Sequence, residues 1–509
     1  MSAPGSSADR PAILRTMTAG SRGALMVCGT TSDAGKSTVV AGLCRLLARR
    51  GVSVAPFKGQ NMSNNSWVTI DGGEIGRSTA AQAMAAGVEP EVTMNPVLLK
   101  PTSDRHSQVV VLGRPVVELD AAAYHRRKTD LLPVVLEALA DLRSRFDVVL
   151  LEGAGSPAEI NLLERDVVNL PLARAAGGIP AIVVGDIERG GVFAQLAGTV
   201  LLLPDDLRRL VRAFVVNRMR GDPALLGDGF AELERRCGVP TIGVLPHLGP
   251  LLVDAEDSLA LERMTTGDAV ATLDVAVLRF PRISNFTDLE PLVAEPGVAI
   301  RWVQGPAQLG RPDLVVLPGT KATVADLQWL RTSGLDDALR RLVAEGTVVL
   351  GICGGYQMLG RSIDDPVESG AGRVAALGLL PADTVFAPTK VTRRRRGAAL
   401  ACTIEGYQIH HGVVRADGDG WIELDDEDGP VCEGSRAGSV FGTTLHGLFE
   451  IDGFRSAFLA SVAEGAGRSW TPSGRSFAER RQAEVDRVAD ALEAHLDLDH
   501  LFALIEDSP

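Results

Sequence analysis

The segment Gly29–Ser37, with the sequence GTTSDAGKS, constrains the fold of this chain more than any other feature. It lies between the apolar run Ala24–Cys28 and a segment, Ser37–Arg50, with the composition of a helix. Successive backbone N–H groups and the N-terminus of a following helix favour a phosphate group at such a turn, and Lys36 adds a positive charge. The Ser37 hydroxyl is suited to bind magnesium. We therefore predict a strand, a phosphate-binding loop and a helix that together bind a nucleoside triphosphate.

The loop departs from the usual spacing of this motif. Five residues separate Gly29 from Gly35, where four are usual, and Thr30 occupies the position expected for a glycine. A loop of the form G-T-x-x-x-x-G-K-S resembles that of dethiobiotin synthetase and its relatives, which use ATP to phosphorylate a carboxylate. This resemblance implies that Thr30, Gly35, Lys36 and Ser37 bind the nucleotide.

Length and composition favour an α/β enzyme. A chain of 509 residues is long enough for two or more domains, each with its own core. Hydrophobic residues make up 45% of the chain and aromatic residues only 4%, as expected for buried parallel strands and covering helices rich in Ala, Val and Leu. The six cysteines show neither close pairing nor metal-ligand spacing, which is typical of a cytoplasmic protein.

Charge and hydropathy argue against two classes of partner. The net charge of −13 does not favour nucleic acid, and the one basic run, Arg393–Arg396, is interpreted as a solvated loop. No apolar stretch reaches the roughly 18 residues that suggest a membrane span. We therefore expect neither nucleic acid nor membrane as a partner, and the sequence leaves open whether the chain forms a homo-oligomer.

Apolar runs alternate with helical patterns in two separate series. This alternation predicts two doubly wound α/β domains with mostly parallel sheets, and active residues at the carboxyl ends of the strands. Shorter runs with Gly and Asp turns late in the second series indicate some antiparallel structure. The predicted segments are a disordered tail (1–22), a first domain (23–250), a linker (251–272), a second domain (273–465) and a C-terminal helical extension (466–509).

A second chemical centre is predicted in the segment Gly351–Gly355. Cys353 lies there between a buried strand and a helix start, where a tight turn exposes the side chain and the helix N-terminus stabilises a thiolate. We predict Cys353 as a nucleophile rather than a structural cysteine. His446, at the end of another strand-like run, is the predicted base, and backbone N–H groups of Gly319 and Gly354 are predicted to stabilise an oxyanion.

This arrangement resembles a class I glutamine amidotransferase domain, with Cys353 and His446 in the nucleophile and base positions. His410 and His411 are the other histidines that could act as the base, and we assign this pair a structural or substrate-side role instead. The class commonly carries a glutamate two residues after its histidine, where this chain has Leu448. The departure matches the subgroup that accompanies cobyrinate amidation, in which the third member is missing. Glu450 is a candidate to orient His446, and the sequence leaves open which residue does so.

Nearly the whole chain resembles the cobyric acid synthase family. The segments 57–66, 94–101 and 152–161 carry the resemblance together with the two centres, and the run Gln60–Ser66 is its most specific element. The family amidates four peripheral carboxylates of a corrin ring in cobalamin biosynthesis, with glutamine as nitrogen donor and one ATP for each amide. The resemblance implies a P-loop NTPase-like N-terminal half, a flavodoxin-like glutaminase C-terminal half, and glutamine and a corrinoid as substrates.

Further residue roles are implied by the same resemblance. Glu152 would hold Mg²⁺ together with Ser37, and Lys58 would contact the transferring phosphate. Asn217 lies where the relatives bind the adenine edge. Side-chain amides suit the carboxylates and amides of a corrin, and Asp166 is a further substrate candidate whose alternative role is helix capping. The amide residues assigned to the corrin are Gln60, Asn61, Asn64 and Asn65.

Several alternatives remain open at this point. Cobyrinic acid a,c-diamide synthase shares both halves but amidates two carboxylates, and the run Gln60–Ser66 argues against it. A partitioning-type ATPase switch fused to a glutaminase-like binding domain would leave Cys353 inert. For single residues, Glu152 is alternatively a salt-bridged strand-end residue and Lys58 a solvated surface lysine.

Overall fold

The computed structural model describes residues 22–120, 123–124, 128–249, 272–418 and 420–508, together with the single residues 17, 20 and 251. Most of the predicted linker at 251–272 and most of the predicted tail at 1–22 lie outside the described residues. Met17, within that tail, is buried against the core of the N-terminal half. Within the described ranges, no helix has the length and apolar character needed to cross a membrane.

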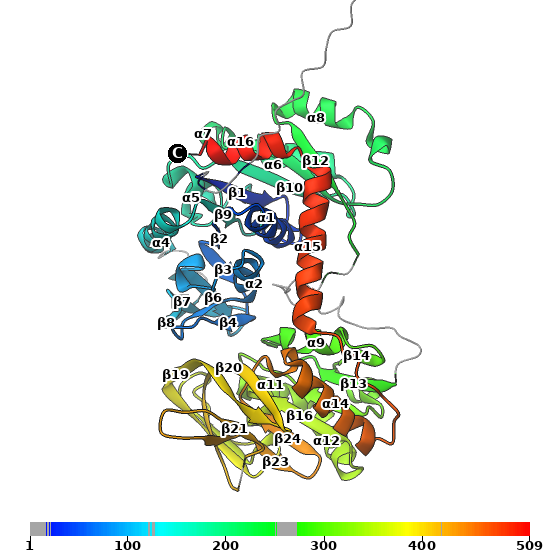
Figure 1. Ribbon diagram of the computed structural model, residues 1–509. Coiled ribbons are helices and arrows are strands. Elements are labelled where there is room, and N and C mark those ends of the chain that lie inside the picture. The colour runs from blue at the N-terminus through cyan, green and yellow to red at the C-terminus, as the bar shows by residue number, and fades with distance from the viewer. Residues whose placement is uncertain are drawn as a thin grey trace, which may run out of the picture.

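The N-terminal half is built on a six-stranded sheet with the order β12-β11-β10-β1-β9-β2, in which all neighbouring strands are parallel (Figure 1). Ala24 and Met26 of β1 enter the core on one face, and Leu25 and Val27 enter the core on the other. Because both faces are covered, the strands are mainly apolar, and Glu152 and Asp186 lie at the carboxyl ends of β9 and β10. The elements are β1 (Gly23–Gly29), α1 (Lys36–Arg49), β2 (Val54–Phe57), α4 (Leu132–Arg145), β9 (Val148–Glu152), α5 (Leu170–Ala175), β10 (Ala181–Asp186), α6 (Val192–Leu201), α7 (Asp205–Arg208), β11 (Val211–Met219), α8 (Gly229–Cys237) and β12 (Thr241–Pro246), with 3-10 helices η2 (Lys128–Leu131), η3 (Leu163–Arg165) and η4 (Pro223–Leu226).

A smaller unit is inserted between β2 and α4. It consists of a four-stranded sheet with the order β3-β6-β7-β8, a hairpin of β4 and β5, and the helix α2. In Figure 1 this unit lies at the bottom of the N-terminal half, where it faces the other half. Its elements are β3 (Gln60–Met62), β4 (Ser66–Val68), β5 (Glu74–Gly76), α2 (Arg77–Ala85), η1 (Val92–Met94), β6 (Val97–Pro101), β7 (His106–Val111) and β8 (Arg114–Asp120).

The C-terminal half contains a second six-stranded sheet, with the order β14-β13-β15-β16-β24-β23. All neighbouring pairs are parallel except β23 with β24. The predicted pair of doubly wound α/β folds is thereby confirmed. The elements are β13 (Leu273–Leu278), η6 (Phe286–Leu289), α9 (Glu290–Val293), β14 (Val298–Val303), α10 (Pro306–Leu309), β15 (Leu314–Leu317), α11 (Thr323–Thr332), α12 (Leu335–Ala344), β16 (Val348–Ile352), α13 (Gly354–Leu359), β23 (Ser435–Ala437), β24 (Val440–Thr443), η7 (Leu448–Glu450) and α14 (Asp452–Gly465).

A largely antiparallel sheet follows in the same half, as the late part of the sequence indicated. Its order is β18-β17-β19-β21-β22, and β20 pairs with β19. The interpretation of Arg393–Arg396 as a solvated loop is wrong, because the run lies within β19. Arg394 Nε donates to Val68 O at 2.9 Å, and Arg395 is buried beside Asp426. The elements are β17 (Ser362–Asp365), β18 (Gly372–Ala375), β19 (Ala382–Ala399), β20 (Cys402–Ala416), β21 (Ile422–Leu424) and β22 (Val431–Glu433).

The C-terminal helices return to the N-terminal half. Figure 1 shows α15 (Phe477–His495) running from the C-terminal half to α1, and α16 (Leu498–Glu506) packs beside β1. Arg45 Nε lies 2.7 Å from Asp486 Oδ1 across the α1–α15 contact. A Cβ atom at Gly42 would lie 2.5 Å from Leu492 Cδ1, so the close helix approach requires glycine there. The predicted extension at 466–509 therefore includes two helices of the N-terminal core.

The hairpin and α2 of the inserted unit contact the C-terminal half directly. Ser66 N donates to Asn285 Oδ1 at 3.2 Å, and Asn285 Nδ2 donates to the Tyr407 hydroxyl at 2.8 Å. Arg77, the first residue of α2, binds Glu450 at 2.5 Å between Nη2 and Oε1. These contacts place the predicted corrin-binding run next to the predicted glutaminase.

Candidate active sites

The phosphate-binding loop is closely packed around the side chains of Lys36 and Asn217. Gly35 has φ of 100°, and a Cβ atom there would lie 2.1 Å from Asn217 Nδ2, so glycine is required. Lys36 Nζ donates to Thr31 O at 2.9 Å and Ser32 O at 3.0 Å. Thr30 Oγ1 donates to Gln195 Oε1 at 3.1 Å. The predicted nucleotide residues therefore share one loop, with Asn217 directly beside it.

Glu152 is fully buried at the carboxyl end of β9, where it gathers three polar side chains. Its Oε1 accepts hydrogen bonds from Ser37 Oγ at 2.8 Å and Lys58 Nζ at 3.0 Å, and its Oε2 accepts one from Gln82 Nε2 at 2.5 Å. Burial alone would raise the pKa of Glu152, but the charge of Lys58 and these hydrogen bonds hold it below its ordinary value. Lys58 is only 2% exposed, so it is not a solvated surface lysine. Glu152 does form a salt bridge with Lys58, as the alternative role of a salt-bridged strand-end residue requires.

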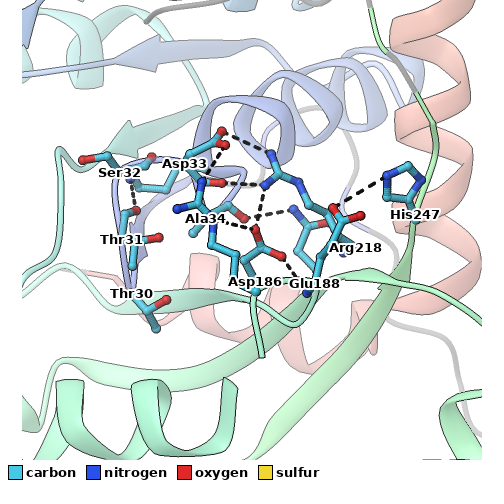
Figure 2. A network of polar contacts seen from close by, with 12 residues as sticks. Thr30, Thr31, Ser32, Asp33, Ala34, Asp186, Glu188, Arg218 and His247 are labelled. Carbon is cyan, nitrogen blue, oxygen red and sulfur yellow. Dashed lines mark hydrogen bonds and ion pairs between the residues drawn. The ribbon is translucent and has the colours of Figure 1, made fainter. Parts of the chain in front are cut away.

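An ionic network that sequence reasoning missed holds the middle of the loop (Figure 2). Arg218 Nη1 donates to Asp33 O at 2.9 Å and to Asp186 Oδ2 at 2.7 Å, and its Nη2 lies 3.2 Å from Asp33 Oδ1. Asp186 ends β10, while Arg218 lies in β11 with φ of 63°. The sequence indicated only that Asp186 and Arg218 lie at or near the ends of predicted strands. The network fixes the loop from the two neighbouring strands.

The predicted substrate residues have different environments. Gln60 Oε1 accepts a hydrogen bond from the Tyr124 hydroxyl at 2.7 Å, and Asn65 Oδ1 accepts one from Phe286 N at 3.1 Å. Asn61 is buried, and neither side-chain polar atom has a hydrogen-bond partner among the described residues. Asn64 donates to Pro101 O at 3.3 Å, and its Oδ1 is likewise unpartnered in the described part of the chain.

Asp166 stabilises a local turn before α5. Its Oδ1 accepts hydrogen bonds from Val168 N at 2.7 Å and Asn169 N at 2.9 Å, just before α5 begins, and its Oδ2 accepts one from Asn169 Nδ2 at 2.8 Å. Both carboxylate oxygens are thus used by the adjoining chain. The bonded N–H groups precede α5, whose N-terminus has no side-chain cap, so Asp166 stabilises the turn before the helix and does not cap the helix itself.

Cys353 lies at the turn between β16 and α13, as the glycine-rich segment predicted. Its backbone has φ of 49° and ψ of −108°, a strained conformation for a residue with a Cβ atom. A Cβ atom at Gly355 would lie 1.9 Å from Leu317 O, so β15 packs too closely for any larger residue. The turn therefore holds the sulfur at the start of a helix, where a thiolate is stabilised.

Asp288 orients His446, a role for which the sequence offered Glu450 as a candidate and which it left open. Asp288 Oδ2 lies 2.7 Å from His446 Nδ1, and its Oδ1 accepts a hydrogen bond from Gly447 N at 2.8 Å. The expectation for Glu450 is wrong, because that carboxylate binds Arg77 and Arg481. Asp288 lies in η6, and no local spacing in the sequence connects it to a histidine 158 residues later.

The charge state of His446 suits a partner of Cys353. Burial alone would lower the pKa of His446, but the charge of Asp288 and hydrogen bonds to Asp288 and Cys353 raise it to about 10. His446 is therefore protonated at neutral pH, beside the sulfur. An imidazolium next to a cysteine stabilises the thiolate, which is the nucleophilic form.

The two predicted oxyanion glycines adjoin this centre. A Cβ atom at Gly319 would lie 3.1 Å from His446 Cε1, and one at Gly354 would lie 2.7 Å from Thr320 Cγ2. Gly319 is thus packed tightly beside His446, and Gly354 is packed against Thr320. A pocket lies beside it, lined by residues that include Cys353, His446, Gln357, His410 and His411.

Comparison with known proteins identifies both halves of the chain. A model described as a CobQ/CobB/MinD/ParA nucleotide binding domain matches residues 25–251, and one described as a CobB/CobQ-like glutamine amidotransferase domain matches residues 274–454. A cobyric acid synthase from Nocardia farcinica is 55% identical over 96% of this chain and 97% of its own length. The chain belongs to the cobyric acid synthase family. It is thus an ATP-dependent amidating ligase with a glutamine amidotransferase domain.

Other members of the family show the same extent of similarity. Cobyric acid synthases from Mycobacterium sp. (strain KMS) and Streptomyces avermitilis are 54% and 52% identical, over 96% and 95% of this chain and 97% and 96% of their own lengths. Among solved structures, a glutamine amidotransferase aligns with 38% of this chain and 98% of its own at 21% identity, with a TM-score of 0.30.

The assignment of Asp288 makes a specific prediction for this family member. Asp288→Asn keeps the shape of the side chain but removes the charge that holds His446 protonated, so kcat for glutamine hydrolysis should fall by about 10²- to 10⁴-fold. Ammonia release from glutamine measures this rate. Glu450→Gln leaves the Asp288 contact intact and should change kcat much less. Equal losses in the two variants would contradict the assigned role.

Proposed function

We propose that this protein makes adenosylcobyric acid by amidating four peripheral carboxylates of adenosylcobyrinic acid a,c-diamide. The observation that carries the proposal is the presence, in one chain, of a Cys353–His446–Asp288 centre and a phosphate-binding loop with a buried Lys58–Glu152 pair. The first suits release of ammonia from glutamine, and the second suits activation of a carboxylate by ATP. Membership of the cobyric acid synthase family supports joining the two steps.

In the C-terminal half, the Cys353 thiolate attacks the side-chain amide carbon of glutamine. Backbone N–H groups of Gly319 and Gly354 stabilise the resulting oxyanion, and His446 donates its proton to the departing ammonia. Water then attacks the thioester while His446 accepts a proton, and glutamate leaves. Asp288 keeps the imidazole in the orientation that both proton transfers need.

In the N-terminal half, the substrate carboxylate must become an acyl phosphate before ammonia can replace its oxygen. Lys36 and the loop amides hold the phosphates of ATP, and Lys58 contacts the transferring group. Mg²⁺ would neutralise phosphate charge. The Ser37 hydroxyl and the ionised Glu152 carboxylate, 2.8 Å apart, fit the oxygen ligands that this ion prefers and would hold it.

The corrin is assigned to the inserted unit, next to the contact between the halves. Asn61 and Asn64 carry buried polar atoms that have no hydrogen-bond partner among the described residues, and such atoms normally find one in a ligand or water. Side-chain amides can donate to a carboxylate and accept from an amide, so they suit the substrate and its successive products. Asn65 instead contributes to the interface through Phe286 N.

Two other functions make different predictions. An ATPase switch with an inert Cys353 does not require the strained turn at Cys353 or the ionic partner of His446, yet both are present. A cobyrinic acid a,c-diamide synthase would share both centres and differ in the number of amides made. Product analysis distinguishes these possibilities.

The test is mass analysis after incubation with cobyrinic acid a,c-diamide in adenosylated form, ATP, Mg²⁺ and glutamine labelled with ¹⁵N in its side-chain amide. We expect a final product carrying four labelled amides. Parallel incubations with unlabelled ammonium chloride and no glutamine should yield the same product without label. A product that gains fewer than four amides would contradict the proposal, and no product would favour the switch.

A further inference from the structure

Three buried charged side chains meet where the two halves join. Lys390 of β19 and Lys100 of β6 both bind Glu74 of β5: Lys390 Nζ lies 2.5 Å from Glu74 Oε2, and Lys100 contacts Oε1. Lys100 Nζ also donates to Ser66 Oγ at 2.9 Å. The side chains of all three are at most 5% exposed. The group therefore spans the interface, with one lysine from each half on a single carboxylate.

The charges of this group do not balance. Glu74 is fully buried, which would raise its pKa, but Lys100 and Lys390 hold that pKa well below its ordinary value, so the carboxylate is ionised. Burial lowers the pKa of Lys390 to about 8, although Glu74 opposes this effect. At neutral pH two ammonium groups thus face one carboxylate. One positive charge is left over in a buried position, where an uncompensated charge is costly.

Among the described residues, the neighbouring groups do not supply the missing negative charge. Lys321 is paired with Glu368, so these two charges compensate each other. Burial lowers the pKa of His410 to about 4, so its imidazole is neutral at pH 7. His446 is paired with Asp288. The surplus positive charge near Lys390 therefore suits an anionic group from a ligand.

The same pocket contains the catalytic centre. Lys100, Lys390, Cys353, Gln357 and His446 all line it, and its empty volume is about 430 Å³. Glutamine bound with its side-chain amide at Cys353 must place its α-carboxylate, its only anionic group, elsewhere in this pocket. A buried ammonium group binds a carboxylate through strong, charge-assisted hydrogen bonds.

We propose that Lys390 and Lys100 bind the α-carboxylate of glutamine, so that the N-terminal half completes the glutaminase pocket. The inference rests on the proposed glutaminase function. Lys100 lies in β6, whose residues Val97, Leu98 and Leu99 pair with Gln60–Met62 of β3. The glutamine site is therefore joined through one pair of strands to the run assigned to the corrin, and correct docking of the halves is a requirement for glutamine binding.

The test compares Lys390→Met and Lys100→Met with the wild-type full chain in glutamine hydrolysis. Each variant leaves Glu74 with one lysine, so the buried carboxylate keeps a counter-ion and the fold is preserved. We expect KM for glutamine to rise by about tenfold to a hundredfold in Lys390→Met and Lys100→Met, with a smaller change in kcat. Thermal unfolding of each variant checks that the structure is intact.

A substrate analogue separates carboxylate recognition from a general defect. 4-Aminobutanamide is glutamine without the α-carboxylate, so the wild-type protein should hydrolyse it poorly, and Lys390→Met should reduce that rate little further. An equal loss of hydrolysis rate on both substrates, or an unchanged KM for glutamine in both variants, would overturn this inference and leave the proposed function standing. Failure of the wild-type chain to hydrolyse glutamine would overturn the proposed function as well.

Discussion

Replacing Cys353 by serine is expected to abolish glutamine-dependent amidation while amidation supported by free ammonia continues. The protonated His446 and the helix start stabilise a thiolate, and neither is sufficient to ionise a hydroxyl group at neutral pH. Loss of a nucleophile from such a centre reduces kcat by about 10⁴-fold or more. The measurement is amide formation on the corrinoid, with glutamine in one series and ammonium chloride in the other.

The strained turn makes serine the appropriate replacement. Serine has nearly the same shape as cysteine, so the backbone at φ 49° and the close contact of Gly355 with Leu317 are kept. Cys432→Ser is a matched control, because Cys432 is an exposed cysteine on β22. This substitution should leave amide formation unchanged with glutamine and with ammonium chloride. Full glutamine-dependent activity in Cys353→Ser would mean that the sulfur is inert, as in a switch protein.

The parts of this molecule that could be predicted from sequence are those determined by short segments. The apolar runs around Val148–Glu152 and Leu314–Leu317 identified parallel strands, because strands covered on both faces are apolar throughout. The loop at Gly29–Ser37 and the turn at Cys353 were found because glycines at fixed offsets are needed for their backbones. These features depend on neighbours within about ten residues.

The parts that were missed depend on contacts between distant segments. Asp288 reaches His446 across 158 residues, and Arg218 reaches Asp33 across 185. Arg393–Arg396 appeared to be a loop because a strand with four arginines contradicts local composition, yet β19 places Arg394 against the other half. A carboxylate or a guanidinium gives no sequence signal of the partner that it will find in the fold.

Glu152→Gln is expected to abolish amidation with either nitrogen source, in contrast to substitution of Cys353. The carboxylate accepts hydrogen bonds from Ser37, Lys58 and Gln82 in the site proposed to hold Mg²⁺. A neutral amide would weaken the binding of the metal and would leave Lys58 buried without its counter-ion. We expect a fall in kcat of about 10²- to 10³-fold, and a loss of stability of about 3–5 kcal/mol. Amide formation with ammonium chloride and thermal unfolding measure the two effects.

A second variant separates catalysis from stability, because a salt bridge at a strand end would also explain this pair. Lys58→Met/Glu152→Gln removes both buried charges, so much of the lost stability should return. Lys58→Met alone reports what the lysine contributes to stability and to the rate of amidation. Glu91→Gln, which breaks an exposed pair with Arg145, is the surface control and should cost at most about 1 kcal/mol. Because Lys58 is itself assigned to the transferring phosphate, the comparison is with Lys58→Met: if Glu152 holds the metal, the double variant regains stability but amidates more slowly than Lys58→Met alone. Recovery of amidation together with stability would show that Glu152 serves only to neutralise Lys58.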